Sequence, residues 1–270
     1  MTSSSYHIVV CAGIVPDPLQ TLEPVIAAPL PGLKNEMMLP HVLDPWACHA
    51  LYEAAHLAKS APGSRVWLVT LGPKAKVQQV MMTMAQKVPF EFVALDGPSS
   101  GFTDAPAVAE RLAAAIEGIA GLDRSRLLLF GGWESASRGA GATLQIVGER
   151  LGITEQFQGV DECVPQPDGS LRILERVEGG RHQVSLCAGP PLVCGWATGN
   201  LPEPPNNPQI GMQNMRAIMP ALQKATQAAL QTSGITFEKI EVPQQRRDTR
   251  IEKNASPEQI AREIVEWIQS

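Results

Sequence analysis

The sequence predicts an α/β fold in which a mostly parallel β-sheet is doubly wound, with helices on both faces. The first observation is a set of continuous apolar runs, such as residues 127–130, which are typical of strands buried on both faces. The second is that these runs alternate with helical patterns through short connections, as right-handed crossovers require. With 270 residues, of which 44% are hydrophobic, the chain can bury a sizeable core.

The first 150 residues carry most of this alternation. Asp44 followed by Pro45 is typical of a helix N-cap and first helical position, and Pro62-Gly63 ends that helix. Residues 14–34 are rich in Pro and lack periodicity, so we expect an extended excursion over the surface. The predicted strands are residues 7–12, 65–71, 90–95 and 127–130, and the helices between and after them lie near residues 45–61, 77–84, 105–119 and 144–151.

An antiparallel addition to the sheet is predicted after residue 153. Short apolar segments at residues 160–163, 171–177 and 183–187 are separated by Asp168-Gly169 and Gly179-Gly180, which are typical hairpin turns. One more buried strand is expected at residues 192–197, and the Pro-rich residues 200–208 predict a loop. A helix is then expected over residues 215–230, ended by Gly234.

The last 35 residues predict an arm rather than a domain. We place a boundary between an α/β domain of residues 1–235 and an arm of residues 236–270, because residues 237–250 show no periodicity. Ser256-Pro257 opens a final helix, and its apolar face consists of Ile260, Ile264, Trp267 and Ile268. That face must pack either on the same domain or on a partner subunit.

The ends of three predicted strands meet in small residues, and this predicts a ligand cleft. They are Cys11-Ala12-Gly13, Thr70-Leu71-Gly72 and Gly131-Gly132-Trp133, at the sheet edge where ligands of open α/β sheets gather. The last is followed by a small-residue loop and a helix, whose N-terminus suits a phosphate near residues 135–143. This pattern indicates a Rossmann-like fold of the adenine-nucleotide-binding type. Neither GxGxxG nor GxxxxGK[ST] is present, so an ordinary glycine-rich turn remains the alternative.

Composition and spacing argue against several other functions. The net charge of −5 and the lack of a basic stripe do not favour nucleic-acid binding. The five cysteines form no CxxC pair, which argues against zinc or iron–sulfur sites, and no segment predicts a signal peptide or membrane insertion, so we expect a cytoplasmic protein. His49, His56 and His182 have no converging partners, and Ser135 and Ser137 lack a nucleophile-elbow context. We therefore expect no enzyme active site.

An ordered series of segments resembles the beta subunit of electron transfer flavoproteins. The segments are VCAGIVPDP, LDPWACHALYEAAHL, VWLVTLGP, LLLFGGWES followed by TLQIVGERLG, ILERVEGG and NPQIGMQNMRA, which span nearly the whole chain. The resemblance implies a heterodimer with an alpha subunit that holds most of a shared FAD. It also implies electron transfer from a flavin-dependent dehydrogenase to a quinone oxidoreductase or another acceptor. In this family the beta subunit carries AMP or, in electron-bifurcating members, a second FAD.

The resemblance carries over to individual positions only in part. Family members usually have Val-Lys-Arg in place of Ala12-Gly13-Ile14, and Asn-Pro-Phe-Asp where this chain keeps only Asp44. Leu71-Gly72-Pro73 matches, whereas the phosphate loop at residues 137–143 keeps only Thr143 and gains Arg138. AMP, a second FAD or no nucleotide therefore remain open. The implied cofactor-binding residues are Cys11, Ala12, Gly13, His41, Asp44, Leu71, Gly72, Gly132, Ser137, Arg138, Gly139, Gly141, Ala142 and Thr143.

The resemblance also implies a loop that docks the dehydrogenase through an apolar anchor. Residues 206–215 occupy this region, and Ile210, Met212 and Met215 are the candidate docking residues. The alternative is that Met212 and Met215 simply begin the apolar stripe of the following helix.

Two functions from different classes follow. The first is the beta subunit of an electron transfer flavoprotein, and the second is a stand-alone adenine-nucleotide-binding regulatory domain of the same sheet type. The arm favours the first, because an independent domain has no need of a long segment that ends in an amphipathic helix.

Overall fold

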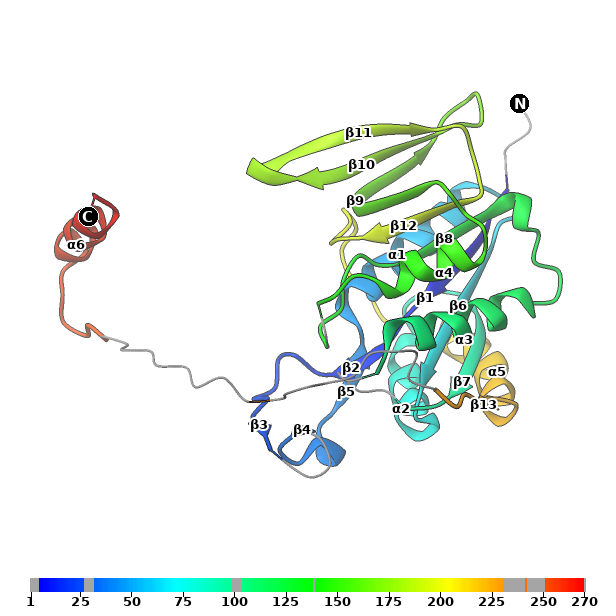
Figure 1. Ribbon diagram of the computed structural model, residues 1–270, viewed down its shortest axis with the longest axis horizontal. Coiled ribbons are helices and arrows are strands. Elements are labelled where there is room, and N and C mark those ends of the chain that lie inside the picture. Colours follow the sequence, from blue (N-terminus) through cyan, green and yellow to red (C-terminus); the bar gives the residue numbers. More distant parts are fainter. Residues whose placement is uncertain are drawn as a thin grey trace.

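The computed structural model of the chain describes residues 5–26, 32–98, 103–137, 139–230, 241 and 251–269. One nine-stranded sheet runs through the protein, and helices cover both faces of its central part (Figure 1). In spatial order the strands are β11 (Arg181–Cys187), β10 (Leu171–Val177), β9 (Gln156–Pro165), β12 (Leu192–Trp196), β8 (Leu127–Gly132), β1 (His7–Cys11), β6 (Arg65–Gly72), β7 (Glu91–Asp96) and β13 (Thr226–Gln227).

The sheet is parallel from β9 to β13, as the continuous apolar runs predicted. Along the sheet, β12, β8, β1, β6 and β7 are neighbours, so the chain starts in the middle, builds outward to β7 and then returns to the other side of β1. This is the strand order of a doubly wound fold that is compatible with the Rossmann type. Its direction of winding reverses between β1 and β8, and such a reversal opens a crevice at the carboxyl ends of these two strands.

Two layers of helices cover the parallel strands, because successive side chains of a strand point to opposite faces. Ile8 and Val10 of β1 join one hydrophobic cluster, and Val9 and Cys11 join the other. The first cluster packs under α1 (Pro45–Ser60), α2 (Lys74–Met84) and α5 (Pro208–Gln223), and the second under α3 (Ala105–Glu117) and α4 (Thr143–Arg150). The alternating order of helices and strands is as predicted.

The antiparallel addition is confirmed and is continuous with the main sheet. β9 pairs in parallel with β12 on one side and antiparallel with β10 on the other, and β11 completes the edge. The predicted turn residues Gly169, Gly179 and Gly180 all have positive φ, which glycine adopts without strain. Two short 3-10 turns, η2 (Arg124–Arg126) and η3 (Glu178–Gly180), precede β8 and β11.

The expected surface excursion after β1 is partly wrong. β2 (Ile14–Pro16) pairs antiparallel with β5 (His41–Leu43), and both Ile14 and Val15 are buried. The short pair β3 (Pro24–Val25) and β4 (Gly32–Leu33) and the turn η1 (Glu36–Met38) lie further out. A three-residue strand is too short to show periodicity, so the sequence carried no signal for β2 beyond its two apolar residues.

The helix predicted at residues 215–230 is displaced, because α5 begins at Pro208 and ends at Gln223. The side chain of Asn207 accepts hydrogen bonds from the backbone N–H groups of Gln209 and Ile210, so Asn207 is an N-cap and Pro208 occupies the first turn. Buried Asn214 then fastens α5 by donating to the backbone oxygens of Ala85 and Val88 at 2.8 and 2.7 Å. The residues from 206 to 215 are therefore mostly helix and not a loop, which corrects the docking-loop prediction.

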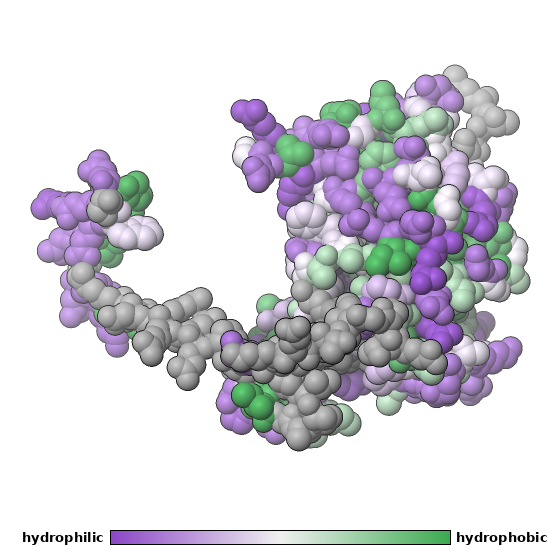
Figure 2. Space-filling view, viewed as in Figure 1, coloured by the Kyte–Doolittle hydropathy of each residue, from purple (hydrophilic) through white to green (hydrophobic). Residues whose placement is uncertain are grey.

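The final helix α6 (Pro257–Gln269) is confirmed and lies apart from the sheet (Figure 1). It buries none of its residues, and Ile260, Ile264, Trp267 and Ile268 are all exposed along one side. Figure 2 shows hydrophobic side chains on one side of this helix and hydrophilic ones on the other. The predicted boundary between residues 235 and 236 lies outside the described residues.

In the described part of the chain, no helix has the length and apolar character that crossing a membrane requires.

Candidate functional site

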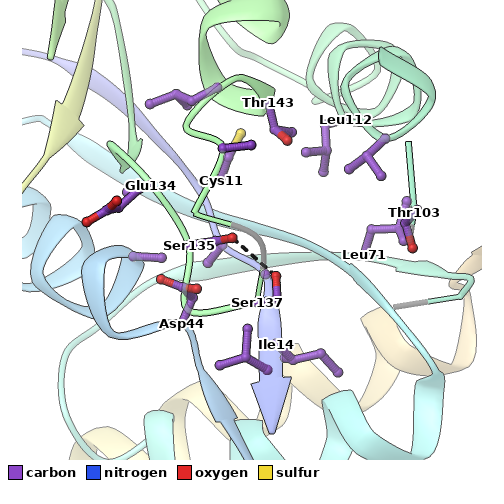
Figure 3. Close-up of a pocket in the computed structure, with 18 of the residues that line it drawn as sticks. Cys11, Ile14, Asp44, Leu71, Thr103, Leu112, Glu134, Ser135, Ser137 and Thr143 are labelled. Atoms are coloured by element: carbon purple, nitrogen blue, oxygen red, sulfur yellow. Dashed lines mark hydrogen bonds between the residues drawn. The ribbon is translucent and has the colours of Figure 1, made fainter. Parts of the chain in front are cut away.

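A pocket opens at the crevice between the carboxyl ends of β1 and β8. Its floor is formed by Cys11, Ala12 and Gly13 at the end of β1 and by Gly132 at the end of β8. The rest of its wall comes from β2, the start of α1, the end of β6, α3 and the segment before it, the β8–α4 loop and the start of α4. The residues are Ile14, Val15, Asp44, Ala47, Leu71, Pro98, Thr103, Val108, Leu112, Glu134, Ser135, Ser137, Ala140, Gly141, Ala142, Thr143 and Leu144. Figure 3 shows Cys11, Ile14, Ser135, Ser137 and Thr143 gathered around this hollow.

The loop from β8 to α4 depends on glycine at two places. A Cβ on Gly132 would lie 2.7 Å from the Cβ of Trp46, so only glycine lets β8 end this close to α1. Gly141 has a φ of +61°, and a Cβ there would lie 2.5 Å from the carbonyl oxygen of Trp133. The loop therefore folds back over its own start and leaves Ala142 and Thr143 at the pocket.

Asp44 ties together the three segments that meet at the pocket. Its backbone N–H donates to the carbonyl oxygen of Gly13 at 2.9 Å, and its carboxylate accepts from the N–H of Trp46 at 3.2 Å, which caps α1. The other carboxylate oxygen accepts from the N–H of Ala136 at 2.8 Å, in the β8–α4 loop. Asp44 thus fixes the relative positions of the segment after β1, the start of α1 and the β8–α4 loop.

Burial raises the pKa of the Asp44 carboxyl to about 6, although the amides of Ala136 and Trp46 lower it and the nearby charge of Glu134 raises it. The group therefore carries a full negative charge only above that pH. Burial likewise raises the pKa of the Cys11 thiol to about 12, so the cysteine at the pocket stays protonated at neutral pH. A protonated, buried thiol is a poor nucleophile, and the pocket is better suited to binding than to covalent chemistry.

The lining of the pocket combines aliphatic side chains with hydroxyl groups. Ile14, Leu71, Val108 and Leu112 supply aliphatic surface from three separate elements. Thr103, Ser135, Ser137 and Thr143 supply hydroxyl groups, and those of Ser135 and Ser137 lie 3.1 Å apart. Thr143 is the first residue of α4, and Ala142 before it offers no capping side chain. Apolar walls with a few placed hydroxyls and a helix start suit a ligand with a flat apolar part and a polar part.

Most of the cofactor-binding residues predicted from the sequence meet at this pocket. They are Cys11, Ala12, Gly13, Asp44, Leu71, Gly132, Ser137, Gly141, Ala142 and Thr143. Gly139 is exposed and does not line the pocket, and Arg138 lies outside the described residues.

His41 and Gly72 lie beside the pocket in structural roles. Nδ1 of His41 lies 2.9 Å from the carbonyl oxygen of Leu39, so that nitrogen is the donor, and Nε2 accepts from the ammonium group of Lys76 at 2.9 Å. Burial, together with the charge of Lys76, lowers the pKa of His41, which keeps the ring neutral. At Gly72 a Cβ would lie 2.8 Å from Cδ1 of Ile14, so this glycine allows β2 to pack on the end of β6.

Sequence reasoning missed the contributions of β2 and α3. Ile14 and Val15 belong to the segment that was assigned to the surface, while Val108 and Leu112 lie on a helix that the sequence placed correctly. Asp104 before Ala105-Pro106 marks the start of α3. Helices that follow parallel strands start at the carboxyl edge of the sheet. The start of α3 could therefore have predicted that this helix borders the pocket.

The three candidate docking residues lie in the first turns of α5. Met212 is 64% exposed, Ile210 is half-buried, and Met215 packs against the core. Met212 and Met215 line a groove between α2 and α5, which also includes Met82, Ala85, Gln86, Pro208, Gly211 and Arg216. A Cβ on Gly211 would lie 2.9 Å from Cγ of Gln86, so this glycine lets α5 pack closely on the segment that follows α2.

No protein-family model matches the chain, and a search of curated proteins gave no match.

Proposed function

We propose that this chain is the beta-type subunit of a heterodimeric electron transfer flavoprotein and that it binds an adenine nucleotide in the pocket between β1 and β8. The observation that carries the proposal is the position of the pocket, at the point where the winding of a parallel sheet reverses. Nucleotides bind at such points in doubly wound folds, with phosphate at a helix start and the base against apolar side chains.

The residues of the pocket fit a nucleotide in a defined orientation. The aliphatic surface of Leu71, Val108 and Leu112 suits the adenine ring, and the hydroxyl groups of the β8–α4 loop and the start of α4 suit the phosphate. The carboxylates of Asp44 and Glu134 repel a phosphate and accept hydrogen bonds, so the ribose hydroxyls are the part of the ligand that fits them. AMP satisfies all three requirements.

In this function the shared FAD supplies the redox chemistry, and the alpha subunit holds most of it. Electrons enter from a flavin-dependent dehydrogenase and leave to a quinone oxidoreductase or another acceptor. This chain contributes binding surfaces: the nucleotide pocket, the exposed face of α6 for the alpha subunit, and the groove between α2 and α5 for the dehydrogenase. The carrier subunit itself performs no acid–base or nucleophilic step.

A stand-alone adenine-nucleotide-binding regulatory domain is the second candidate, because the pocket alone suits it equally well. The exposed apolar face of α6 favours the heterodimer, since a monomeric domain gains nothing from a terminal helix that buries none of its residues.

The test is cofactor analysis of the chain purified together with the alpha subunit encoded in the same organism. We expect acid extraction to release about one AMP or ADP per chain beside the FAD. Thr143→Val should lower nucleotide occupancy, because losing one hydrogen bond to a phosphate weakens binding by about 1–3 kcal/mol. Thr154→Val, at an exposed position in the turn after α4, is the matched control and should leave occupancy unchanged.

Two results would count against the assignment. Full nucleotide occupancy in the Thr143→Val complex would show that this hydroxyl is not a ligand. A stable, fully flavinated monomer obtained without any partner would remove the basis for a two-subunit carrier.

A further inference from the structure

The two edges of the nine-stranded sheet are very different. At one edge β13 has only two residues, Thr226–Gln227, and pairs with β7. At the other edge β11 has seven residues, Arg181–Cys187, and the order of strands ends there. A short edge strand offers few free backbone groups, whereas a seven-residue edge presents a row of N–H and C=O groups that another strand can pair with.

Two large apolar side chains of β11 are exposed beside this edge. Val184 is 55% exposed and Leu186 is 72% exposed, and both point to the same side of β11 because they are two residues apart. In the paired strands, Leu186 lies opposite Arg172, which in turn lies opposite Val164, and Val184 lies opposite Leu174. Natural edge strands are usually guarded by lysines or prolines, and β11 has neither. Of its charged or titratable side chains only His182 shares the face of Val184 and Leu186, and it pairs with Asp161 at 3.0 Å.

The sequence of β11 is compatible with antiparallel pairing to itself. Val184 is the central residue of the strand, so a two-fold axis through it pairs all seven residues. Val184 then faces the second copy's Val184, and Gln183 faces the second copy's Ser185. His182 faces the second copy's Leu186, and Arg181 faces the second copy's Cys187. No two like charges are opposed in this register, and the exposed apolar side chains of both copies fall on one face.

We propose that two copies of this chain associate through β11, joining their sheets edge to edge across a two-fold axis. Such a contact is isologous, because the same strand of each copy forms it. Assembly stops at the dimer, because the β11 edges of both copies are then paired. Seven paired residues and two apolar side chains per copy form a small interface, so we expect a dimer that dissociates on dilution, with a Kd of roughly micromolar size. The inference does not rest on the proposed function, since neither the nucleotide pocket nor α6 takes part.

The test is sedimentation velocity of the full-length chain over a series of concentrations. The wild-type chain should shift from monomer to dimer as concentration rises. Val184→Lys places two ammonium groups directly opposite each other at the two-fold axis, and the Kd should rise tenfold or more. Val177→Lys is the matched control, because Val177 is a comparably exposed valine in the same hairpin but belongs to β10.

A charge-swap mixture separates loss of pairing from loss of folding. Val184→Glu should also be monomeric, and a mixture of the Val184→Lys and Val184→Glu chains should form a dimer again, which a misfolded edge would not do. A wild-type chain that stays monomeric over the whole series overturns the proposal. It is also overturned if the Val184→Lys chain dimerises as well as the wild type. The same holds if Val184→Lys abolishes binding of the alpha subunit but leaves self-association unchanged. Nucleotide content is measured separately, so these outcomes leave the proposed function untouched.

Discussion

At the scale of single residues, Asp44 has the widest influence on the candidate site. It contacts the segment after β1, the start of α1 and the β8–α4 loop through one backbone and two carboxylate hydrogen bonds. The sequence predicted its capping role from the following proline. Its bond to Ala136 could not be predicted, because that contact depends on β8 lying beside β1, across 92 positions of sequence.

The raised pKa of Asp44 predicts a specific dependence of stability on pH. The folded state holds a proton on Asp44 up to a pKa of about 6, whereas the unfolded chain releases it near 3.8, so this group's contribution to stability falls as pH rises between these values. Lowering the pH from 7.5 to 5 should stabilise the wild-type chain by about 1.4 kcal/mol relative to Asp44→Asn, which has no proton to gain.

Urea unfolding of both chains at the two pH values measures this difference directly. The variant controls for every other group that titrates in the range. An equal change in the free energy of unfolding for the two chains would contradict a buried, partly protonated Asp44.

Other pocket residues differ in how far the sequence could predict them. Gly13, Gly132 and Thr143 were predictable, because the carboxyl ends of parallel strands and the helix that follows share one edge of the sheet. Val108 and Leu112 were not, because the rotation of α3 over the sheet decides which of its side chains reach the pocket. That rotation is set by packing against β6 and α4, which no local pattern encodes.

At the scale of elements, α5 shows how a local pattern can be interpreted in two ways. Asn206-Asn207-Pro208 has the composition of a loop, and its two asparagines and its proline predicted one. The same Asn207-Pro208 pair is an N-cap followed by a first-turn proline, and tertiary contacts favoured that alternative. Asn214 lies within the early part of this helix, and its buried amide donates to the backbone oxygens of Ala85 and Val88 in the segment after α2.

Because residues 208–215 are helical, the docking prediction becomes a prediction about the groove between α2 and α5. Met212→Ser should leave the thermal midpoint unchanged, since the side chain is 64% exposed. Because docking is weaker, the variant complex should be needed at about fivefold or more higher concentration for the dehydrogenase to reduce it at the wild-type rate. Met37→Ser, at an exposed methionine outside the groove, is the control. An unchanged rate in a stable Met212→Ser complex would place the docking surface elsewhere.

At the scale of the whole molecule, alternation and spatial order carry different information. The alternation of strand and helix patterns predicted a parallel sheet with helices on both faces, because each apolar run had to be buried from two sides. The doubly wound fold that it predicted requires a return of the chain, but the pattern did not predict that the return would come after β7 and place β8 beside β1. The return depends on which face each crossover helix covers, and it is this return that creates the crevice at β1 and β8.

The arm provides the clearest whole-molecule prediction. α6 has 13 residues, a length at which an isolated helix is only marginally stable in water. Its side chains Ile260, Ile264 and Ile268 are spaced to form one continuous apolar face, and all three are exposed. A partner surface that covers this face would both stabilise the helix and hold the two subunits together.

Replacing Ile264 by Asp should therefore abolish co-purification with the alpha subunit, since burying an unpaired carboxylate weakens binding by about two orders of magnitude or more. The thermal midpoint of the chain purified alone should not change, because α6 buries none of its residues on the α/β domain. Arg262→Ala, on the opposite side of the same helix, is the control and should leave the complex intact. Pull-down of the alpha subunit and thermal unfolding of the lone chain distinguish the possibilities. Undiminished co-purification of the Ile264→Asp chain would exclude α6 as a subunit contact, whereas a lowered midpoint would show that the helix packs on its own chain.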